Sequence, residues 1–480
     1  MKVLFIINME DLGFEEPLGV LYLSAVCKKN NHKVYAVDNK LHEIEDKIET
    51  VKPDLLAVSV LTPSFPYLFD NIKKIRAIYD IPTVFGGPHA TFFPEIIKQP
   101  EIDYVFMGEC EDAFVEFLNL LDEGKAFGGL NNLVSIDDNG QVRQNPVKPL
   151  IGMLEDIPFP DRDLFADYAQ FYKTDVRSII AGRGCPYNCS YCFNDQYHKM
   201  YEGLGKLMRV RSVDNIVEEC LELKHKYKAK MLHFFDDIFP YQRDWLQEFA
   251  DKYAGKVNLP FFTNTRFDSC SEEYIRNLSR AGCKTLLIGV ETGNEELRRM
   301  VLKRRMTNKM MIDKAKIIHS YGIKIYAQNI VGLPHGSLEK DFETLKLNID
   351  LKADLAQAYT CQPYPKTDIE RMAREAGLLD ESFEIGRSFY YPSPLKLPYK
   401  KDLEKFRIVF PIIVNFPFLY GFTRIILKFP DYPLKLVSSF LHGYKVKSVV
   451  LRYKMGMRVF LVNVKIFFAR KINSAFGSEG

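Results

Sequence analysis

Short apolar runs alternate with amphipathic stretches over the first 135 residues of the chain. The candidate strands are Lys2–Ile7, Lys33–Val37, Leu55–Leu61, Thr83–Phe85 and Tyr104–Met107. Each run is largely apolar, as parallel strands buried on both faces are. Helical stretches, among them Pro17–Lys29 and Tyr67–Tyr79, lie between them. The pattern predicts a doubly wound α/β domain over residues 1–135, with its ligands beyond the carboxyl ends of the strands.

A turn and a connector follow this domain. Residues 133–136 and 142–144 flank Asp137-Asp138-Asn139-Gly140, which is a strong hairpin sequence. The segment around Pro158 and Pro160 favours extended backbone. We therefore expect a hairpin and a linker over residues 136–175.

The alternation resumes between residues 176 and 385. The candidate strands there are Arg177–Ala181, Met231–Phe235, Phe261–Asn264, Thr285–Gly289, Ile323–Ile330 and Ala356–Tyr359. The candidate helices between them are Asp214–Tyr227, Asp244–Tyr253, Ser271–Arg280, Asn308–Tyr321 and Glu339–Ile349. Six such units predict a full or partial parallel βα barrel, with an active site at the carboxyl ends of its strands.

Charge sets residues 386–480 apart from the rest of the chain. Between residues 400 and 471, ten Lys and five Arg stand against three acidic residues, a net charge of +12, whereas the whole chain carries +3. Aromatic residues interleave with this charge, among them Phe416, Phe418, Phe422, Phe460, Phe467 and Phe468. Prolines at 411, 417, 430 and 433 are expected to break any long helix.

This composition predicts a basic, apolar and mainly helical extension over residues 386–480. Basic and apolar residues together are typical of an element lying on an anionic lipid surface. An ordinary helical cap with a solvated basic face has the same composition, and nucleic-acid binding is a weaker alternative.

The remaining composition bears on the compartment. The chain is 47% apolar and 26% charged, as globular proteins are. No run approaches about 18 uninterrupted apolar residues, so no membrane-spanning helix is predicted. Nine cysteines, an odd number and mostly scattered, indicate a reducing compartment. We expect a cytoplasmic protein, with peripheral contact at the inner face of the membrane through residues 400–471 as a further hypothesis.

One short loop after the first barrel strand carries the most specific chemistry. It contains Cys185, Cys189 and Cys192 at C-x3-C-x2-C spacing. Three thiolates cannot all pair as disulfides, but they can hold a metal centre from one side. On a four-iron cube they would leave one iron without a protein ligand. A zinc site completed by His198 is the competing interpretation.

With the aromatic Tyr191 before its last cysteine, this loop resembles that of the radical S-adenosylmethionine superfamily. The resemblance implies a [4Fe-4S] cluster whose open iron binds S-adenosylmethionine and cleaves it to a 5′-deoxyadenosyl radical. It also implies cofactor contacts in the cysteine loop and at the later strand ends. The residues concerned are Tyr191, Phe193, Asp236, Asp237, Arg266, Glu291 and Gly332.

The family assigns a part of the cofactor to each strand end. Asp236 or Asp237 would meet the amino group, Glu291 the ribose or methionine moiety, and the stretch through Gly332 the adenine. Arg266 could pair with the methionine carboxylate as a bidentate donor. Taken singly, each residue also has an ordinary interpretation as a helix cap, a solvated strand end or a structural ion pair.

Three stretches at the strand ends of the first domain resemble a cobalamin-binding domain. The candidate contacts are Ser59, Thr62, Gly86, Gly87, His89, Gly108 and Glu109. For the glycines, a tight strand-to-helix turn is the alternative. The D-x-H-x-x-G motif, which supplies a histidine to cobalt in this family, is absent, and His42 lies at the wrong spacing from Asp38.

Together the two resemblances, which cover about residues 1–380, imply a cobalamin-binding radical S-adenosylmethionine enzyme. The leading hypothesis is methylation of an unactivated carbon in a lipid or lipid-linked substrate, with a flavodoxin- or ferredoxin-type reductant. Radical cyclisation, C–C coupling or rearrangement with the same cofactors is an alternative. A non-catalytic cobalamin- or zinc-binding regulatory protein is another. Cys361 is a candidate donor to the product radical, although a buried structural cysteine is the competing interpretation.

Overall fold

The computed structural model describes residues 1–12, 15–168, 175–380, 383, 385 and 392–453. Residues 169–174 of the expected linker, and Phe460, Phe467 and Phe468 of the expected extension, lie outside these ranges. The chain forms two compact units, Met1–Tyr172 with Gln196–Arg209, and Lys173–Asp195 with Val210–Gly480. The four-part domain division expected from the sequence stays a prediction. Within the described ranges, every helix is too short or too polar to cross a membrane.

The first unit is built on a seven-stranded sheet of order β2-β1-β3-β4-β5-β6-β7. Its parallel strands are β1 (Lys2–Ile7), β2 (Lys33–Asp38), β3 (Leu55–Ser59), β4 (Thr83–Gly86) and β5 (Tyr104–Phe106). The antiparallel strands β6 (Leu133–Ile136) and β7 (Val142–Gln144) form the expected hairpin at one edge. All five parallel strands and the hairpin were expected from the sequence.

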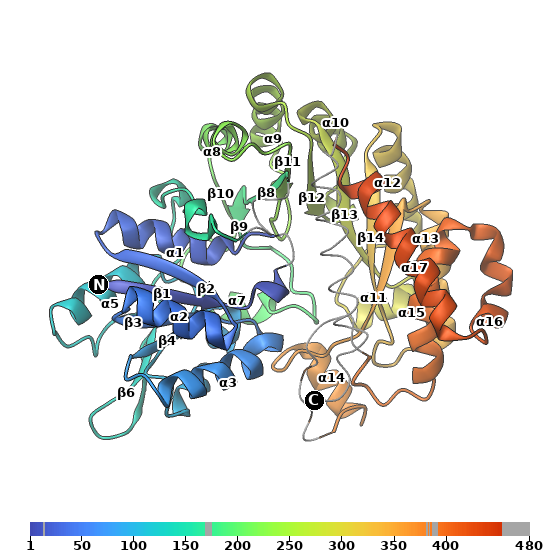
Figure 1. Ribbon diagram of the computed structural model, residues 1–480. Coiled ribbons are helices and arrows are strands. Elements are labelled where there is room, and N and C mark those ends of the chain that lie inside the picture. Colours follow the sequence, from blue (N-terminus) through green and yellow to red (C-terminus); the bar gives the residue numbers. More distant parts are fainter. Residues whose placement is uncertain (13–14, 169–174, 381–382, 384, 386–391, 454–480) are drawn as a thin grey trace. The chain divides into compact units, whose positions relative to one another are not determined.

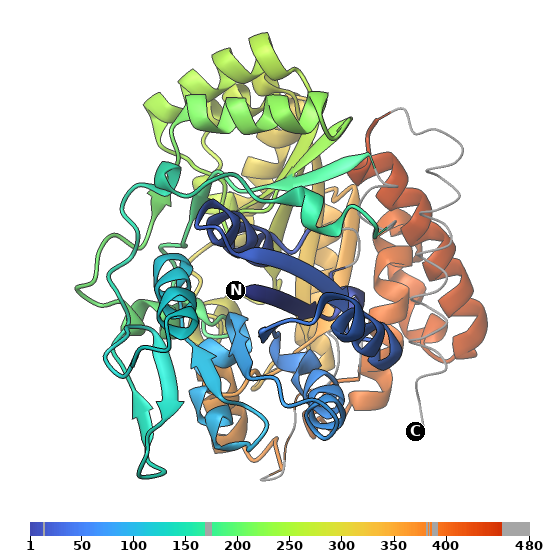
Figure 2. The same cartoon turned by 60° about the vertical axis from the view of Figure 1, so that its left-hand side comes forward.

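Helices cover both faces of this sheet (Figure 1, Figure 2). On one face, α1 (Leu18–Lys29) packs with α5 (Glu111–Asp122), and on the other α2 (Leu41–Val51) packs with α3 (Phe65–Arg76). The short helices η2 (Thr62–Ser64) and α4 (Gly87–Phe92) follow β3 and β4. The strand order reverses direction beside β1, and ligands of doubly wound sheets bind at such a point, beyond the carboxyl ends of the strands.

The second unit holds a six-stranded parallel sheet in which each strand pairs with the next along the chain. Its strands are β8 (Val176–Ile179), β11 (Met231–Phe234), β12 (Phe261–Thr265), β13 (Cys283–Glu291), β14 (Lys324–Val331) and β15 (Leu355–Thr360). Within the described ranges, β8 and β15 are the unpaired edges of this sheet. The structure is therefore the partial form of the expected barrel. A separate ladder joins β9 (Gly182–Arg183) and β10 (Arg209–Val210).

The five expected barrel helices are present between the strands (Figure 1). They are α8 (Val213–His225), α9 (Arg243–Lys252), α10 (Glu272–Ala281), α12 (Asn308–Ser320) and α13 (Leu338–Asp350). In four of them a Ser or Thr side chain caps the first turn, which is why the chain turns into helix there. The sequence analysis missed α7 (Asn194–Met200), α11 (Glu295–Met300) and α14 (Asp368–Glu375), which are too short to show a clear period.

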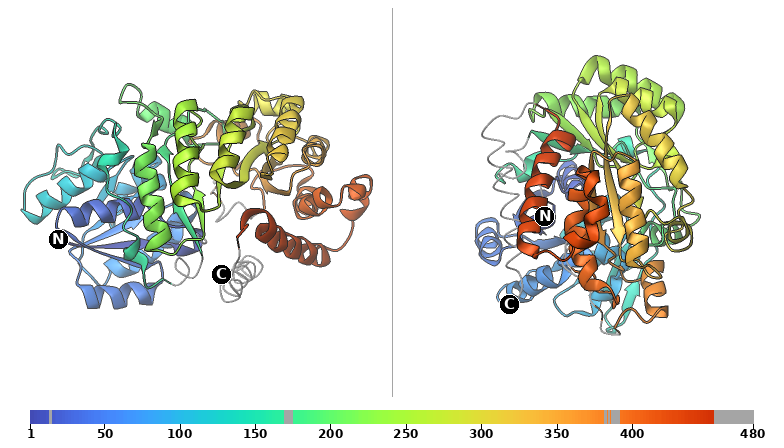
Figure 3. Two further views of the ribbon diagram at one scale, coloured as in Figure 1. Left: turned by 90° about the horizontal axis from the view of Figure 1, so that it is seen from above. Right: turned by 90° about the vertical axis from the view of Figure 1, so that its right-hand side faces the viewer.

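The described part of the basic extension, residues 392–453, is mainly helical, as expected. Helix α15 (Lys400–Asn415) packs along β15, and α17 (Asp431–Lys445) packs on α15 (Figure 3). Between them lie η8 (Pro417–Phe422) and α16 (Thr423–Ile426), and η9 (Val446–Val450) follows. The expectation that Pro411 breaks the helix is wrong, because it lies inside α15. Burial of α15 side chains such as Phe406 and Phe410 against the barrel offsets the lost backbone hydrogen bond.

Candidate active site

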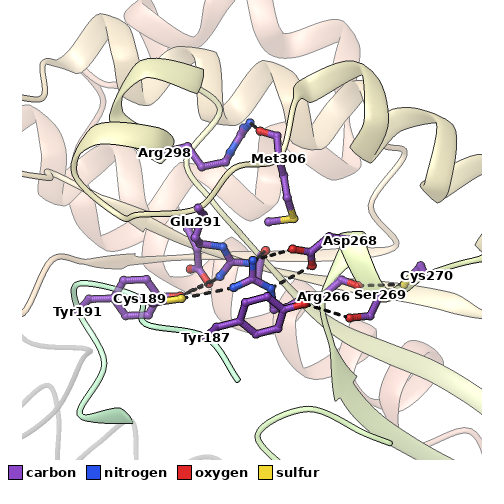
Figure 4. Close-up of polar contacts among 12 residues, drawn as sticks. Tyr187, Cys189, Tyr191, Arg266, Asp268, Ser269, Cys270, Glu291, Arg298 and Met306 are labelled. Atoms are coloured by element: carbon purple, nitrogen blue, oxygen red, sulfur yellow. Dashed lines mark hydrogen bonds and ion pairs between the residues drawn. The ribbon is translucent and has the colours of Figure 1, made fainter. Parts of the chain in front are cut away.

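The three predicted cluster ligands share one loop between β9 and α7: Cys185, Cys189 and Cys192. Nitrogen donors favour the thiolate form of these sulfurs. Burial raises the pKa of Cys185 and Cys192, and the backbone N–H groups of Tyr187 and Asn194 oppose this rise. Nη1 of Arg266 donates to Cys189 Sγ at 3.4 Å (Figure 4). Hydrogen bonds of this kind stabilise thiolate ligands and tune the reduction potential of a bound cluster. The surroundings of the three sulfurs therefore fit ligation of a [4Fe-4S] cluster.

The zinc interpretation, with Cys185, Cys189, Cys192 and His198 around one ion, stays an alternative. In the part of the chain that the structure describes, no group of three His, Cys, Asp or Glu side chains converges as the ligands of a single ion do. Thiolates that bind different irons of a cube stand farther apart than the ligands of one tetrahedral ion. Burial raises the pKa of Cys185 to about 11 and that of Cys192 to about 12, so binding of iron would displace their protons.

Arg266, predicted to pair with the methionine carboxylate, already has a carboxylate partner. Its Nε and Nη2 donate to the two oxygens of Asp268 at 3.0 and 2.8 Å (Figure 4). Its guanidinium carbon lies 3.5 Å from the ring centroid of Tyr187. Arg266 therefore ties the end of β12 to the cysteine loop, and its contact with the cofactor stays a prediction.

Tyr191 and Glu291, both predicted cofactor contacts, touch each other. The Tyr191 hydroxyl donates to Glu291 Oε1 at 2.8 Å (Figure 4). Arg304 Nη1 donates to that hydroxyl at 2.8 Å and to Glu291 Oε1 at 2.7 Å. The sequence analysis missed Arg304, because its burial inside the basic run at 303–305 leaves no signal in the sequence.

The backbone at the end of β13 explains how Glu291 reaches this position. Glu291 has φ 63°, and the register with β14 shifts between Gly289 and Glu291. A Cβ atom on Gly289 would lie 2.1 Å from Glu291 Oε1. Only glycine at 289 therefore lets the carboxylate fold back over the strand end.

The two aspartates after β11 have different environments. Asp236 is buried and accepts hydrogen bonds from the backbone N–H groups of Ala181 and Gly182 at 3.0 and 2.7 Å. Burial raises its pKa to about 7. Asp237 is exposed, and its Oδ2 accepts from Asn194 at 3.3 Å. Asp236 thus shapes the turn that enters the cysteine loop, and Asp237 is the better candidate for the predicted amino-group contact.

The other predicted barrel residues lie at two places, because Gly332 and Cys361 are both near Asp341. The Phe193 ring meets Tyr364 edge-on at 5.4 Å. Gly332, at φ 71°, donates its N–H to Asp341 and would clash with Leu403 if it carried a Cβ atom. Cys361 is 1% exposed after β15, and burial raises its pKa to about 12. This burial favours the structural interpretation of Cys361, and its role as a radical donor stays a prediction.

In the first unit, the glycine pair at the end of β4 borders open space. Ser59 and Gly86 are register partners at the carboxyl ends of β3 and β4. A Cβ atom on Gly86 would meet nothing within 4 Å, whereas one on Gly87 would lie 3.1 Å from the Val60 backbone. Gly87 also has φ +88°. The close turn at Gly87 and the space at Gly86 fit a sheet edge that receives the tail of a cobalamin.

Thr62 and His89 belong to the adjacent packing. The His89 ring lies between Phe65 and Phe93, with centroids 4.3 and 4.8 Å away. Its Nδ1 is 3.3 Å from Thr62 Oγ1, and both residues are buried. These contacts give both residues a structural role, and direct cofactor contact by them stays a prediction.

Gly108 and Glu109 form a second feature of the same edge. Glu109 accepts from the Tyr197 hydroxyl and from Arg209 Nη1, each at 2.8 Å, and its N–H donates to the Tyr201 hydroxyl at 2.8 Å. A Cβ atom on Gly108 would overlap that same hydroxyl. Sequence reasoning missed these partners, which lie up to 100 residues further along the chain. They show Glu109 as an anchor of the first unit, and a cofactor contact by Glu109 stays a prediction.

Two protein-family models match the chain, and the residues that each matches include one of the two candidate sites. The model described as B12 binding domain matches residues 6–118, and that described as Radical SAM superfamily matches residues 179–347. An uncharacterized methyltransferase of Pyrococcus horikoshii is 28% identical over 76% of this chain and 79% of its own length. The anaerobic magnesium-protoporphyrin IX monomethyl ester cyclase of Rubrivivax gelatinosus is 27% identical over 84% of this chain and 74% of its own.

A more distant relative and a solved structure are also similar to this chain. The hopanoid C-3 methylase of Methylococcus capsulatus is 22% identical over 74% of this chain and 68% of its own length. Among solved structures, the radical S-adenosylmethionine methyltransferase TsrM of Kitasatospora setae, with cobalamin and a [4Fe-4S] cluster bound, superposes with a TM-score of 0.70. That match is 15% identical and covers 99% of both chains, so it shows a common fold.

Proposed function

Since this chain is a cobalamin-binding radical S-adenosylmethionine enzyme, we propose that it transfers a methyl group to an unactivated carbon of a lipid or lipid-linked substrate. When bound, the cluster with S-adenosylmethionine supplies a 5′-deoxyadenosyl radical, and cobalamin supplies a transferable methyl group. The observation that carries the proposal is the cysteine loop between β9 and α7, in which Arg266 donates a hydrogen bond to the sulfur of Cys189.

The protein's own residues would hold and orient these cofactors. The three cysteines would ligate the cluster, with the Arg266–Asp268 pair fixing the position of Cys189. Asp237, exposed beside the loop, would accept a hydrogen bond from the amino group of S-adenosylmethionine. The buried Glu291 and Arg304 neutralise each other's charge, and both hydrogen-bond the Tyr191 hydroxyl.

Methyl transfer to a lipid is supported by two kinds of observation. Relatives of the chain include a protein named as a methyltransferase and a hopanoid C-3 methylase. The described part of the basic extension also exposes many large apolar side chains, which suits contact with a lipid phase. We therefore include peripheral membrane contact through residues 400–471 in the proposal, together with a flavodoxin- or ferredoxin-type reductant.

Radical cyclisation is the second candidate reaction, and the similarity to the magnesium-protoporphyrin ester cyclase favours it. The two reactions differ in the fate of the methyl group. The chain, purified without oxygen, is incubated with a reductant, lipid extract and S-adenosylmethionine carrying a labelled methyl group. Label in a lipid product supports methylation. Turnover to 5′-deoxyadenosine with no label in any product would refute it in favour of cyclisation, coupling or rearrangement.

A cysteine series tests the cluster in the same preparation. Cys185→Ala, Cys189→Ala and Cys192→Ala should each lower bound iron and abolish cleavage of S-adenosylmethionine. Cys220→Ala, a buried cysteine of α8 outside the loop, is the matched control and should keep both. A wild-type protein with one zinc and no iron would instead establish the non-catalytic alternative.

A further inference from the structure

Large apolar side chains on the surface of the second unit concentrate in one stretch. Of 18 exposed large apolar side chains among the described residues, ten lie between residues 416 and 444. They are Phe416, Phe418, Phe422, Ile425, Phe429, Tyr432, Leu436, Val437, Phe440 and Tyr444. Scattered exposed apolar residues are normal, but a contiguous group marks an interaction surface.

Helix α17 carries the most regular part of this surface. Tyr432, Leu436, Phe440 and Tyr444 recur at every fourth position and are 73%, 55%, 80% and 62% exposed. Residues four apart lie on one face of a helix, so they form a continuous stripe along α17. A surface helix normally turns its apolar face to the core, whereas α17 turns this one outward. We call this stripe the α17 face.

Cations lie beside the stripe and not within it. Lys428 and Lys435 are exposed, and neither pairs with an acidic side chain in the described ranges. Arg424, by contrast, is held by Glu339 and by the ring of Phe342. An apolar helix face bordered by unpaired lysines is the arrangement of an interfacial helix on anionic lipid.

We propose that the α17 face is the surface by which this enzyme docks on an anionic lipid bilayer. The inference deepens the proposed function, since it assigns the peripheral membrane contact to one helix face. Charge argues against a second copy of the chain as the occupant, because two copies would bring the same lysines together. The same charge argues against residues 454–480, which carry five cations and one acidic residue.

The experiment measures binding of the full chain to vesicles without substrate or S-adenosylmethionine, so it does not depend on the reaction. We expect sedimentation with phosphatidylcholine vesicles that contain phosphatidylglycerol, weaker binding to phosphatidylcholine alone, and loss of binding at high salt. The variant Leu436→Glu/Phe440→Glu should bind roughly tenfold less. The control Ile78→Glu/Met300→Glu adds the same charge at positions 65% and 61% exposed and should bind like the wild type.

A second readout places the helix relative to the bilayer. The chain has one tryptophan, Trp245, which is part-buried in α9. Phe440→Trp should give a new fluorescence component that vesicles with brominated acyl chains quench, whereas Trp245 should not respond.

Three results would overturn the proposal. Binding to anionic vesicles could be absent, or equal in the Leu436→Glu/Phe440→Glu variant. The wild type could be a dimer that this variant dissociates, which would make the α17 face an interface between copies. The variant could also unfold several degrees below the wild type, which would mean that residues 454–480 cover the face. Methyl transfer to a detergent-dispersed substrate would remain measurable in each case, so failure of membrane docking is distinct from failure of the proposed methyl transfer.

Discussion

The Tyr191 hydroxyl donates a hydrogen bond of 2.8 Å to the carboxylate of Glu291, 100 residues away in the chain. Tyr191 precedes the last cysteine of the loop, and Glu291 ends the fourth barrel strand. Burial raises the pKa of Tyr191 well above its usual value, so the hydroxyl stays protonated and remains the donor. The contact therefore ties the cysteine loop to the barrel.

The variant Tyr191→Phe should weaken the contact between the cysteine loop and the barrel, and the protein should still bind the cluster. The variant loses two hydrogen bonds of the hydroxyl, one to Glu291 and one from Arg304, which should lower the free energy of unfolding by about 2–3 kcal/mol, because Arg304 and Glu291 still bind each other. Urea unfolding followed by Trp245 fluorescence measures this, and iron content should not change. Tyr187→Phe is the control, since that hydroxyl makes only a 3.5 Å contact with Ser269. Equal stability of the two variants would contradict the role given to Tyr191.

Arg304→Met should have a larger effect on the barrel. It leaves the buried Glu291 carboxylate without its cation, a change that costs about 3–5 kcal/mol. The neighbouring Arg305 is exposed, so Arg305→Met should change the free energy of unfolding by less than about 0.5 kcal/mol. Adding Glu291→Gln to Arg304→Met should recover part of the loss. A double variant whose loss equals the sum of the single losses would show that the two residues do not interact.

Gly86→Ala and Gly87→Ala should separate ligand binding from stability in the first unit. At Gly87, φ of +88° makes alanine unfavourable by roughly 1–2 kcal/mol, and we expect a lower thermal midpoint. At Gly86, φ is −143° and the added Cβ atom meets nothing, so the midpoint should hold. That atom would occupy space needed by the cobalamin tail, and we expect roughly tenfold weaker binding in equilibrium dialysis. Unchanged cobalamin affinity in Gly86→Ala would place the pocket elsewhere.

Asp341 should make the stability of the barrel depend on pH. Burial raises its pKa from 3.8 to about 8, with the Gly332 N–H opposing the shift. Nearby Cys361, which is buried, and Tyr399, which is half-buried, both have raised pKa values, and Glu339 reinforces the shift at Asp341. Between pH 4 and 8 the folded protein keeps a proton that the unfolded chain releases. Stability present at low pH is therefore lost as pH rises through this window.

The variant Asp341→Asn carries no titrating group at this position. Its unfolding midpoint should rise relative to wild type from pH 5 to pH 8, on the order of a few kcal/mol in free energy. Asp313→Asn is the control, because Asp313 lies exposed between Lys309 and Lys316 and its pKa is lowered by them. A difference between Asp341→Asn and wild type that stays constant with pH would contradict the raised pKa.

The sequence was sufficient for the features that depend on local pattern. Buried parallel strands appear in the sequence as apolar runs, so all eleven expected parallel strands are present. The cysteine spacing was enough to predict which loop would hold the cluster. The expected break at Pro411 failed because propensity is local, whereas burial of α15 against the barrel is a tertiary effect.

The chemistry of single side chains was harder to predict, because it depends on partners far away in the sequence. Asp236 and Asp237 are neighbours with similar sequence context, yet one is buried under two backbone donors and the other is exposed. Arg304 has its partners at positions 191 and 291, and nothing near residue 304 indicates them. A sequence motif can therefore identify the strand end at which a site lies. Only the folded chain shows which side chain there points toward the site.

The anchoring of Glu109 by Tyr197, Tyr201 and Arg209 has a consequence for biosynthesis. The first unit includes residues 196–209. The cysteine loop, which precedes them in the chain, must therefore leave the ribosome before these residues can pack into the first unit. A truncated gene that stops at residue 172 would encode a protein lacking three groups that bind Glu109. During translation, the first unit therefore reaches its complete form only after Cys185, Cys189 and Cys192, the predicted ligands of the cluster, have been synthesised.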